Sequence, residues 1–433
     1  MKANKGRRAQ RIIFAAGIGS VALLVLVGWG TIYSSAQSIS FSRNASSTPE
    51  EITKGDERVV DPNVTHIKTP VPMKAIYMSQ CAAGTPSFRE DLTKLIDTTE
   101  LNSIIIDIRD YTGKIAFPTD NPALAGMTSD ACGAKDMKEF VKALHAKKIY
   151  VIGRITVFQN PYYTSLHPEQ AVQRKSGGVW KDYKGLAFVD VGAKPYWDNV
   201  VELAKESYAI GFDELNFDYI RFPSDGPMSE AHYSWDNGKS KPEMLEEFYK
   251  YLHEKLEPLG VVTSADLFGM VTTNTDDLNI GQVLERALPY FDYVAPMVYP
   301  SHYPKGFHGY ANVNANAYNI VHFAMSEAVR RTTSTTSKVD GLTHTKIMKT
   351  VEVPGVNGAA TTTRQEFSGL YEKPAYPASK MRPWVQSFDY PVTYTPAMVA
   401  EQIKAAKDVG LDSYYVWDPA NKYRSLRQVL QNN

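Results

Sequence analysis

The chain has 433 residues, of which 43% are hydrophobic, enough for one large domain or two ordinary ones. Lys and Arg together number 47, and Asp and Glu together also number 47, so the formal net charge is zero. This balance provides neither a basic field nor an acidic tail, and we expect no nucleic-acid partner.

The N-terminus predicts a membrane anchor. Residues 1–11 form a basic tail, and residues 12–33 form an uncharged, mostly apolar run. About 20 apolar residues span a bilayer as a helix, and a basic flank stays in the cytoplasm. We therefore expect a single-pass protein of the cell membrane whose folded part is extracytoplasmic. A cleaved signal peptide is the alternative, because small residues follow at 34–36, but a signal's apolar region is shorter, roughly 7–15 residues.

Residues 34–70 are rich in Ser, Thr, Asn, Pro and charge, and we interpret them as a linker to a domain at 71–433. The two cysteines, Cys81 and Cys132, are both expected to follow early strands at the same end of that domain. Outside the cytoplasm they are able to form a disulfide. Sequence spacing leaves open whether they pair or remain separate thiols.

From Met73 onward, short β-rich runs alternate with segments of helical periodicity. The alternation predicts eight strands, at residues 74–79, 103–108, 149–155, 211–223, 261–267, 293–299, 382–388 and 413–417. Eight strands with helical regions between them predict an α/β fold, the (β/α)8 TIM barrel. A doubly wound sheet is the alternative, but no Gly-rich phosphate turn follows the first strand.

The segment at about 332–380 does not fit the alternation. It begins with a run of Thr and Ser, and only fragments of it have strand character. We interpret it as a partly flexible insertion between strands six and seven. We expect it on the top face, over the mouth of the barrel, where it would cap or extend a substrate groove.

The fourth strand is the most informative segment. Glu214, Asn216 and Asp218 alternate with large apolar residues, which predicts a polar face toward a shared interior. TIM barrels keep their chemistry at the C-terminal ends of the strands. The polar and aromatic residues expected there are Asp107, Arg109, Asp110, Asp218, Arg221, Asp266, Tyr299, Trp384, Gln386, Trp417 and Asp418.

The sequence lacks the motifs of several other classes of enzyme. The chain has no Ser/His/Asp order, no His-Glu-x-x-His zinc helix and no Walker loop. His302 and His308 alone are weak evidence for a metal site. We therefore expect neither a metal nor a cofactor.

Two carboxylates that flank one bond suit glycoside hydrolysis. Asp218 and Asp266 belong to adjacent predicted strands at similar depth. Burial and mutual repulsion would raise the pKa of one of them and make it the acid, and Arg221 would keep the other ionised. A salt-bridged network that fixes strand register is the alternative. Position at a strand end favours catalysis for Asp218, and both interpretations stay open for Asp107 and Asp110.

The segment 213–223 resembles the signature of a bacterial glycoside hydrolase family that is defined largely by sequence. Its catalytic barrel is related to the α-amylase type. Residues 104–110, 264–269, 295–302 and 382–386 resemble the other blocks of that family in the same order, over about 73–430 without the insertion. The resemblance implies a polysaccharide-directed hydrolase with Asp218 as nucleophile and Asp266 as acid. This chain departs from the amylase type in having Asp rather than Glu in strand five.

The leading hypothesis is thus a membrane-anchored, extracytoplasmic glycosidase acting on cell-wall or exopolysaccharide chains. A non-catalytic barrel that binds glycans or serves as a scaffold is the alternative. A phosphorylated substrate is less consistent with the sequence, because the loops after strands seven and eight offer Asp389 and Asp418 and no Gly-rich turn.

Overall fold

The computed structural model describes residues 64–354 and 360–431. The expected basic tail, the expected membrane anchor and residues 34–63 of the expected linker lie outside this described part. Within it, none of the helices has the length and apolar character needed to cross a bilayer.

Eight parallel strands close into a barrel in the order β1-β13-β12-β8-β7-β5-β3-β2. They are β1 (Lys74–Met78), β2 (Ser103–Arg109), β3 (Tyr150–Thr156), β5 (Glu214–Asp218), β7 (Val262–Phe268), β8 (Tyr293–Met297), β12 (Trp384–Gln386) and β13 (Tyr414–Trp417). Every predicted strand corresponds to one of these, so the barrel prediction is confirmed. The fourth strand is shorter than predicted and ends at Asp218, because Tyr219 has φ of 51° and leaves the extended conformation.

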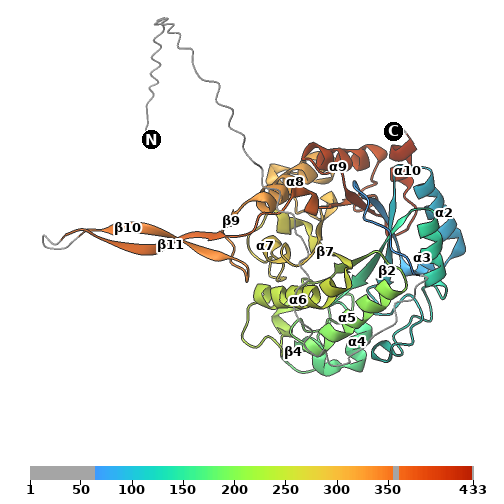
Figure 1. Ribbon diagram of the computed structural model, residues 1–433, viewed down its shortest axis with the longest axis horizontal. Helices are drawn as coiled ribbons and strands as arrows, with labels where there is room; N and C mark the ends of the chain where they lie inside the picture. Colours follow the sequence, from blue (N-terminus) through green and yellow to red (C-terminus); the bar gives the residue numbers. More distant parts are fainter. Residues whose placement is uncertain (1–63, 355–359, 432–433) are drawn as a thin grey trace, which may run out of the picture. The chain divides into compact units, whose positions relative to one another are not determined.

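Helices surround the strands (Figure 1). They are α1 (Gln80–Ala83), α2 (Pro86–Asp97), α3 (Met137–Ala146), α4 (Pro161–Leu166), α5 (Lys194–Ala209), α6 (Lys241–Leu256), α7 (Leu284–Ala287), α8 (Ala317–Thr333), α9 (Pro396–Asp408) and α10 (Arg424–Gln431). Helix α8 was not expected from the sequence, although its buried Ile320, Ala324 and Ala328 recur at helical spacing. Between β7 and β8 lie a short 3-10 helix (Gly269–Thr272) and the four-residue helix α7.

The interior of the barrel is filled below the mouth. Glu214 of β5 pairs with Arg382 at 2.9 Å and accepts hydrogen bonds from the hydroxyls of Tyr150 and Tyr415. All four side chains are buried, so they plug the barrel at the level where the strands begin. Leu215 on the opposite face of β5 packs into the hydrophobic core outside the barrel.

The chain enters the barrel at this lower end. The Ile67 amide donates to Asp213 at 2.8 Å, and the Thr69 hydroxyl lies 3.0 Å from the Tyr150 hydroxyl. Residues 64–70, which the sequence assigned to the linker, therefore contain contacts to the barrel. Cys81, in α1, and Cys132 are joined in a disulfide, with their Cα atoms 4.4 Å apart.

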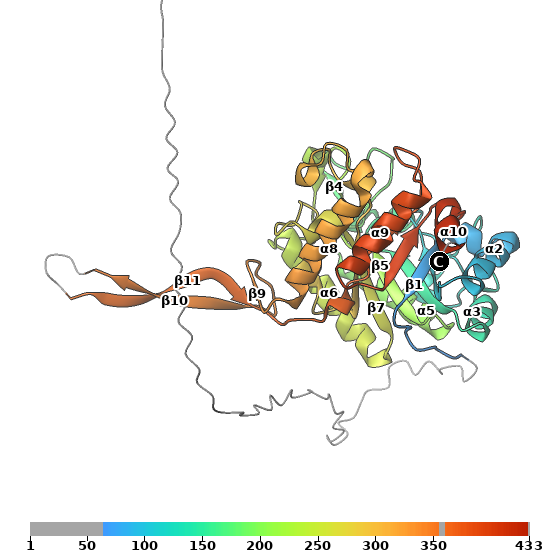
Figure 2. The same ribbon diagram turned by 90° about the horizontal axis from the view of Figure 1, so that it is seen from above.

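The insertion forms an antiparallel sheet of β9 (Thr336–Ser337), β10 (Thr345–Val353) and β11 (Thr362–Glu372). Its base contacts the outside of the barrel, where the Leu342 amide donates to Glu246 of α6 at 2.8 Å and Asp340 pairs with Arg286 of α7. In both views β10 and β11 extend away from the barrel (Figures 1 and 2).

The expectation that the insertion covers the mouth is wrong. Helix α8 first carries the chain back from the C-terminal end of β8. After the insertion, Lys380 donates to the carbonyl of Phe291, just before β8 begins, and Met381 bridges to Val294. The insertion therefore leaves and rejoins the barrel away from the C-terminal ends of the strands.

Candidate active site

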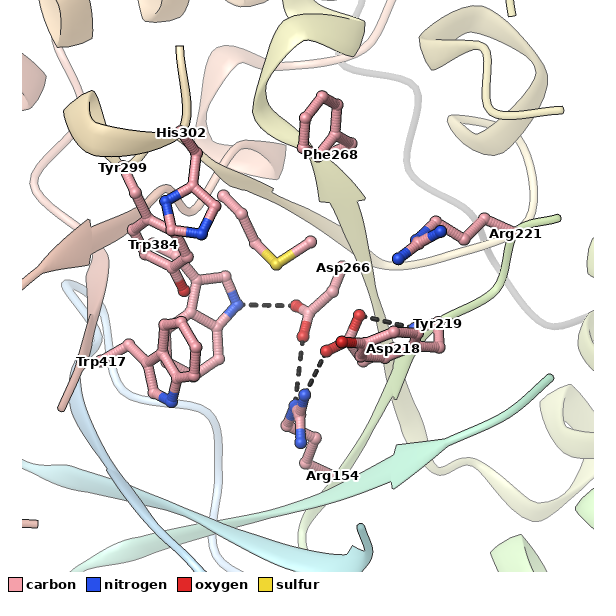
Figure 3. A pocket seen from close by; sticks show the side chains of 11 residues that line it. Arg154, Asp218, Tyr219, Arg221, Asp266, Phe268, Tyr299, His302, Trp384 and Trp417 are labelled. Carbon is pink, nitrogen blue, oxygen red and sulfur yellow. Dashed lines mark hydrogen bonds and ion pairs between the residues drawn. The ribbon is translucent and has the colours of Figure 1, made fainter. Parts of the chain in front are cut away.

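The C-terminal ends of six barrel strands surround a pocket, here called the rim pocket (Figure 3). It is lined by Arg154, Asp218, Tyr219, Arg221, Asp266, Phe268, Met297, Tyr299, His302, Trp384 and Trp417. None of the described residues of the insertion is among them. The pocket thus lies where TIM barrels carry their chemistry.

One guanidinium joins the acidic groups of the site. Arg154, in β3, binds Asp218 through Nη2, and its Nε lies 3.6 Å from Oδ2 of Asp266. Its Nη1 donates to Oδ1 of Asp107 at 2.6 Å. Only 14% of the Arg154 side chain is exposed, so these interactions are weakly screened by solvent. Neighbouring strands therefore bring three carboxyl groups to one cation.

Asp266 is held by hydrogen bonds on one oxygen only. Its Oδ1 accepts from Nε1 of Trp384 at 2.7 Å and from Nδ2 of Asn216 at 2.9 Å. Its Oδ2 has no hydrogen-bond partner among the described residues. Burial, and after it the charge of Asp218, raises the pKa of Asp266 to about 8, against the opposing effect of Arg154. Asp266 therefore carries a proton at neutral pH.

Asp218 has the contacts of a carboxylate anion. It is 3% exposed, one oxygen binds Arg154, and Oδ1 accepts from the amide of Tyr219 at 2.5 Å. Tyr219 has φ of 51°, which is unfavourable for a bulky residue and places backbone strain directly beside Asp218. Two adjacent carboxyl groups thus differ in environment: one is paired with a cation, and the other keeps its proton.

Asp107 lies deeper than these two residues and does not line the rim pocket. It accepts from the Tyr77 hydroxyl and from Arg154. Burial raises the pKa of Asp107 to about 6, because it outweighs the effects of Arg154 and Tyr77. Its position allows it to orient Arg154 rather than to contact a substrate.

Aromatic side chains form one wall of the pocket. The ring centroids of Tyr299 and Trp417 are 5.3 Å apart, and those of Phe388 and Trp417 are 4.9 Å apart. His302 packs against Phe388, and burial lowers the pKa of His302, which favours its neutral form. Rings with an apolar face and a polar edge suit the faces and hydroxyls of a sugar.

Six of the residues expected at the strand ends line the rim pocket: Asp218, Arg221, Asp266, Tyr299, Trp384 and Trp417. Arg221, however, does not hold Asp218, as was expected from the sequence. Its Nη1 donates to the carbonyl of Phe222 and the hydroxyl of Ser224. Arg154 occupies the role expected of Arg221.

The other expected residues lie elsewhere. A register shift between Asp107 and Arg109 turns Arg109 away from the interior, where it donates to the carbonyl of Thr156 at 3.0 Å and to Asn199 at 3.1 Å. Asp110 accepts from the amide of Thr112 and so holds its own turn.

Gln386 and Asp418 stabilise loops next to the pocket. Gln386 accepts from the hydroxyl of Ser301 at 2.8 Å, and Asp418 accepts from the amide of Tyr423 at 2.7 Å. Both side chains are buried and neither lines the rim pocket. They position the loops that carry His302 and follow Trp417.

The sequence did not predict that five residues line the pocket: Arg154, Tyr219, Phe268, Met297 and His302. A signal existed for Arg154, because it is the one charged residue of the otherwise apolar β3. The alternation of β3 places it on the interior face, and an interior cation requires acidic partners.

The sequence matches a protein family described as "Putative glycosyl hydrolase domain" over residues 75–342 and 349–423. No curated protein matches it. Among solved structures, a hypothetical protein from Ruminiclostridium thermocellum ATCC 27405 is 34% identical, with 44% of this chain and 96% of that chain covered and a TM-score of 0.41.

Two other solved structures are more distant in sequence. The PgaB (BpsB) glycoside hydrolase domain from Bordetella bronchiseptica is 12% identical, with 83% and 99% of the two chains covered and a TM-score of 0.54, a likeness of fold. The spore cortex-lytic enzyme SleL from Bacillus megaterium QM B1551 is 9% identical, with 86% and 75% covered and a TM-score of 0.45. Because the family match spans most of the sequence, this chain belongs to that family of glycosyl hydrolase domains and is a glycosidase.

Proposed function

We propose that this protein is a membrane-anchored, extracytoplasmic glycoside hydrolase that cleaves a cell-wall or exopolysaccharide glycan, with Asp266 as general acid and Asp218 as nucleophile or base. The observation that carries the assignment is the contact of both carboxyl groups with the Arg154 guanidinium at the rim pocket. Paired carboxyl groups with different protonation are what glycosidic cleavage requires.

Asp266 supplies the proton. Because its Oδ1 accepts two N–H groups, the proton resides on Oδ2, the oxygen without a hydrogen-bond partner among the described residues. Oδ2 is buried, so the Asp266 carboxyl group has to turn this oxygen toward the rim pocket before the proton passes to the glycosidic oxygen and the bond to the anomeric carbon breaks. Arg154, 3.6 Å from Oδ2, then stabilises the carboxylate that Asp266 becomes.

Asp218 acts on the anomeric carbon. Positive charge develops there as the bond breaks, and the Asp218 carboxylate either attacks this centre or directs a water molecule to it. Water supplies the hydroxyl that ends on the anomeric carbon and the proton that restores Asp266. Trp417 and Tyr299 offer ring faces for the sugar that is cleaved.

The proposed location rests on the basic residues 1–11 and the apolar run 12–33. The disulfide between Cys81 and Cys132 suits an oxidising compartment. Protease treatment of intact cells tests the location. Degradation of the domain while a tag at residue 1 stays protected supports it, and full protection contradicts it.

The activity is tested with the full-length protein in detergent and a panel of wall and capsular glycans, with new reducing ends as the readout. We expect Asp218→Asn and Asp266→Asn to abolish release, and Asp120→Asn, an exposed carboxyl outside the pocket, to retain it. If Asp218→Asn cleaves as well as the wild type, the assignment is wrong. Binding without turnover that survives Asp218→Asn and is lost in Trp417→Ala favours a glycan-binding barrel instead.

A further inference from the structure

Arg221 is a cation of the rim pocket that the proposed mechanism does not use. It follows β5, three residues after Asp218. Its guanidinium lies 4.8 Å from the ring centroid of Tyr219, and Nη1 donates to the carbonyl of Phe222 and the hydroxyl of Ser224, each at 3.1 Å. None of these partners is an acid. Among the described residues, no carboxylate forms an ion pair with Arg221.

Arg154 provides the contrast within the same pocket. It contacts three carboxyl groups and has little capacity left for a ligand. Arg221 keeps Nη2 and Nε free of any hydrogen bond to the described residues, and it is only half-buried. A planar guanidinium with free N–H groups presents the fork that binds a carboxylate or a phosphate through two oxygens.

The position of Arg221 relates it to the sugar. Figure 3 shows its side chain reaching toward the pocket from the side of Tyr219, while Trp384, Trp417 and Tyr299 lie on the opposite side and Asp266 lies between. A sugar ring that rests on the aromatic wall and meets Asp266 with its glycosidic oxygen therefore turns its other substituents toward Arg221.

The balance of charges in the rim pocket is compatible with an anionic group of the substrate beside Arg221. With Asp266 protonated, the charges of Asp218 and Asp107 are balanced by those of Arg154 and Arg221. The negative charge of Asp218 repels an acidic sugar unless a positively charged side chain of the protein also faces that sugar. Arg221 provides this positive charge, on the side of the pocket away from Arg154 (Figure 3).

We propose that Arg221 is a specificity-determining residue that binds an anionic substituent of the sugar, so that the substrate is an acidic glycan carrying carboxylate or phosphate groups. This inference rests on the proposed function, because it places the glycan in the rim pocket. A neutral polymer would need only hydroxyl and amide partners, and a cationic sugar would be repelled by Arg221.

The test measures binding, which does not depend on turnover. Full-length Asp266→Asn protein in detergent is titrated calorimetrically with glucuronic-acid oligosaccharides, with the same oligosaccharides after reduction of the carboxyl groups, and with sugar-phosphate oligomers. Arg221→Gln is added to this background, as is Arg221→Lys, which keeps the charge and loses the fork. Arg364→Gln in β11 of the insertion removes the same charge outside the pocket.

We expect one acidic ligand to bind at least about tenfold more tightly than the reduced counterpart, because a charged hydrogen bond contributes about that much. The probe with this preference identifies carboxylate or phosphate as the substituent. Arg221→Gln should abolish the preference, Arg221→Lys should reduce it, and Arg364→Gln should leave it intact. Raising the salt concentration should weaken binding of the acidic ligand alone.

Each contrary result has one meaning. Equal affinity for acidic and reduced ligands, or a preference that survives Arg221→Gln in a folded protein, overturns the inference. If the preference depends on Arg221 but the wild type releases no reducing ends from any glycan, the inference stands and the proposed function fails. If neutral glycans are hydrolysed and acidic ones are not preferred, the proposed function stands and the inference fails.

Discussion

The Nε atom of Arg154 lies 3.6 Å from Oδ2 of Asp266, the carboxyl oxygen that lacks a hydrogen-bond partner in the described chain. The same guanidinium binds Asp218. A single cation is thus placed to stabilise both the carboxylate that is present before the reaction and the one that forms when the proton leaves. The chemistry of this site depends on that sharing.

Arg154→Gln should lower turnover by about 10²–10³, the scale measured for removal of one preorganised electrostatic partner. It should also destabilise the fold by about 3–5 kcal/mol, because Asp107 and Asp218 remain buried without their cation. Turnover and urea unfolding measure the two effects. Arg330→Gln, an exposed arginine of α8, is the control. Wild-type turnover in Arg154→Gln would contradict the shared role.

The pH profile of hydrolysis should have a basic limb set by Asp266. Its pKa is raised to about 8 by burial and by the charge of Asp218, so activity should fall as the pH rises through about 8. Initial rates from pH 5 to 10 at glycan concentrations well below KM measure this, because kcat/KM reports the pKa of the free enzyme. A basic limb near pH 5 would show that Asp266 is not the proton donor.

The stability of the fold should also decrease with rising pH. The folded pKa of Asp266, about 8, lies above its ordinary value of 3.8, so the folded state retains a proton that the unfolded chain releases. This stabilising contribution is complete below about pH 4 and is lost as the pH rises through about 8. Asp107, with a pKa raised to about 6, contributes a slope of the same sign at lower pH.

Urea unfolding at pH 5, 6.5 and 8 tests this linkage. Asp266→Asn should flatten the dependence above pH 6 and leave the part due to Asp107. The control is Asp120→Asn, which should retain the full slope. An unchanged slope in Asp266→Asn would mean that Asp266 titrates near its ordinary pKa.

Trp384→Phe should move the basic limb of the pH–rate profile to higher pH. The indole N–H donates to Oδ1 of Asp266 at 2.7 Å and lowers the pKa of that residue, so its loss raises the pKa further. The phenyl ring keeps most of the packing. Trp417→Phe is the matched control, since Trp417 lines the same pocket and donates no such bond. A downward shift in Trp384→Phe would contradict the hydrogen-bond geometry.

The hairpin formed by β10 and β11 should be dispensable for cleavage. Thr345 pairs with Glu372 across β10 and β11, so an Asn-Gly turn is able to replace residues 346–371. Since the part of the insertion that the structure describes does not line the rim pocket, hydrolysis of a short oligosaccharide should change less than about twofold, within the range of about ±0.5 kcal/mol for remote surface changes. A large loss of kcat in a folded deletion would place the hairpin in catalysis.

The fold was readable from the sequence because each barrel strand carries its own pattern. Leu215 and Phe217 face outward and Asn216 faces inward within five residues of one strand, so periodicity alone locates it. Asp218 and Asp266 were found for the same reason: both end such strands, and parallel strands end at one rim.

The remaining errors come from interactions between segments. The role of Arg154 is not among the predictions because its partners lie on three other strands, and no local sequence pattern joins them. Arg109 was misplaced because the register shift beside Asp107 breaks the alternation of β2. The predicted position of the insertion over the mouth is wrong because α8 returns the chain to the other end of the barrel before the insertion starts.

The plug formed by Glu214, Arg382, Tyr150 and Tyr415 determines how substrate and product reach and leave the rim pocket. Since these buried residues block the lower end, the described residues leave the rim pocket open only at the C-terminal ends of the strands. The product that occupies the pocket after cleavage therefore has to leave through the same opening by which the next glycan enters. Product release and substrate binding compete for that opening.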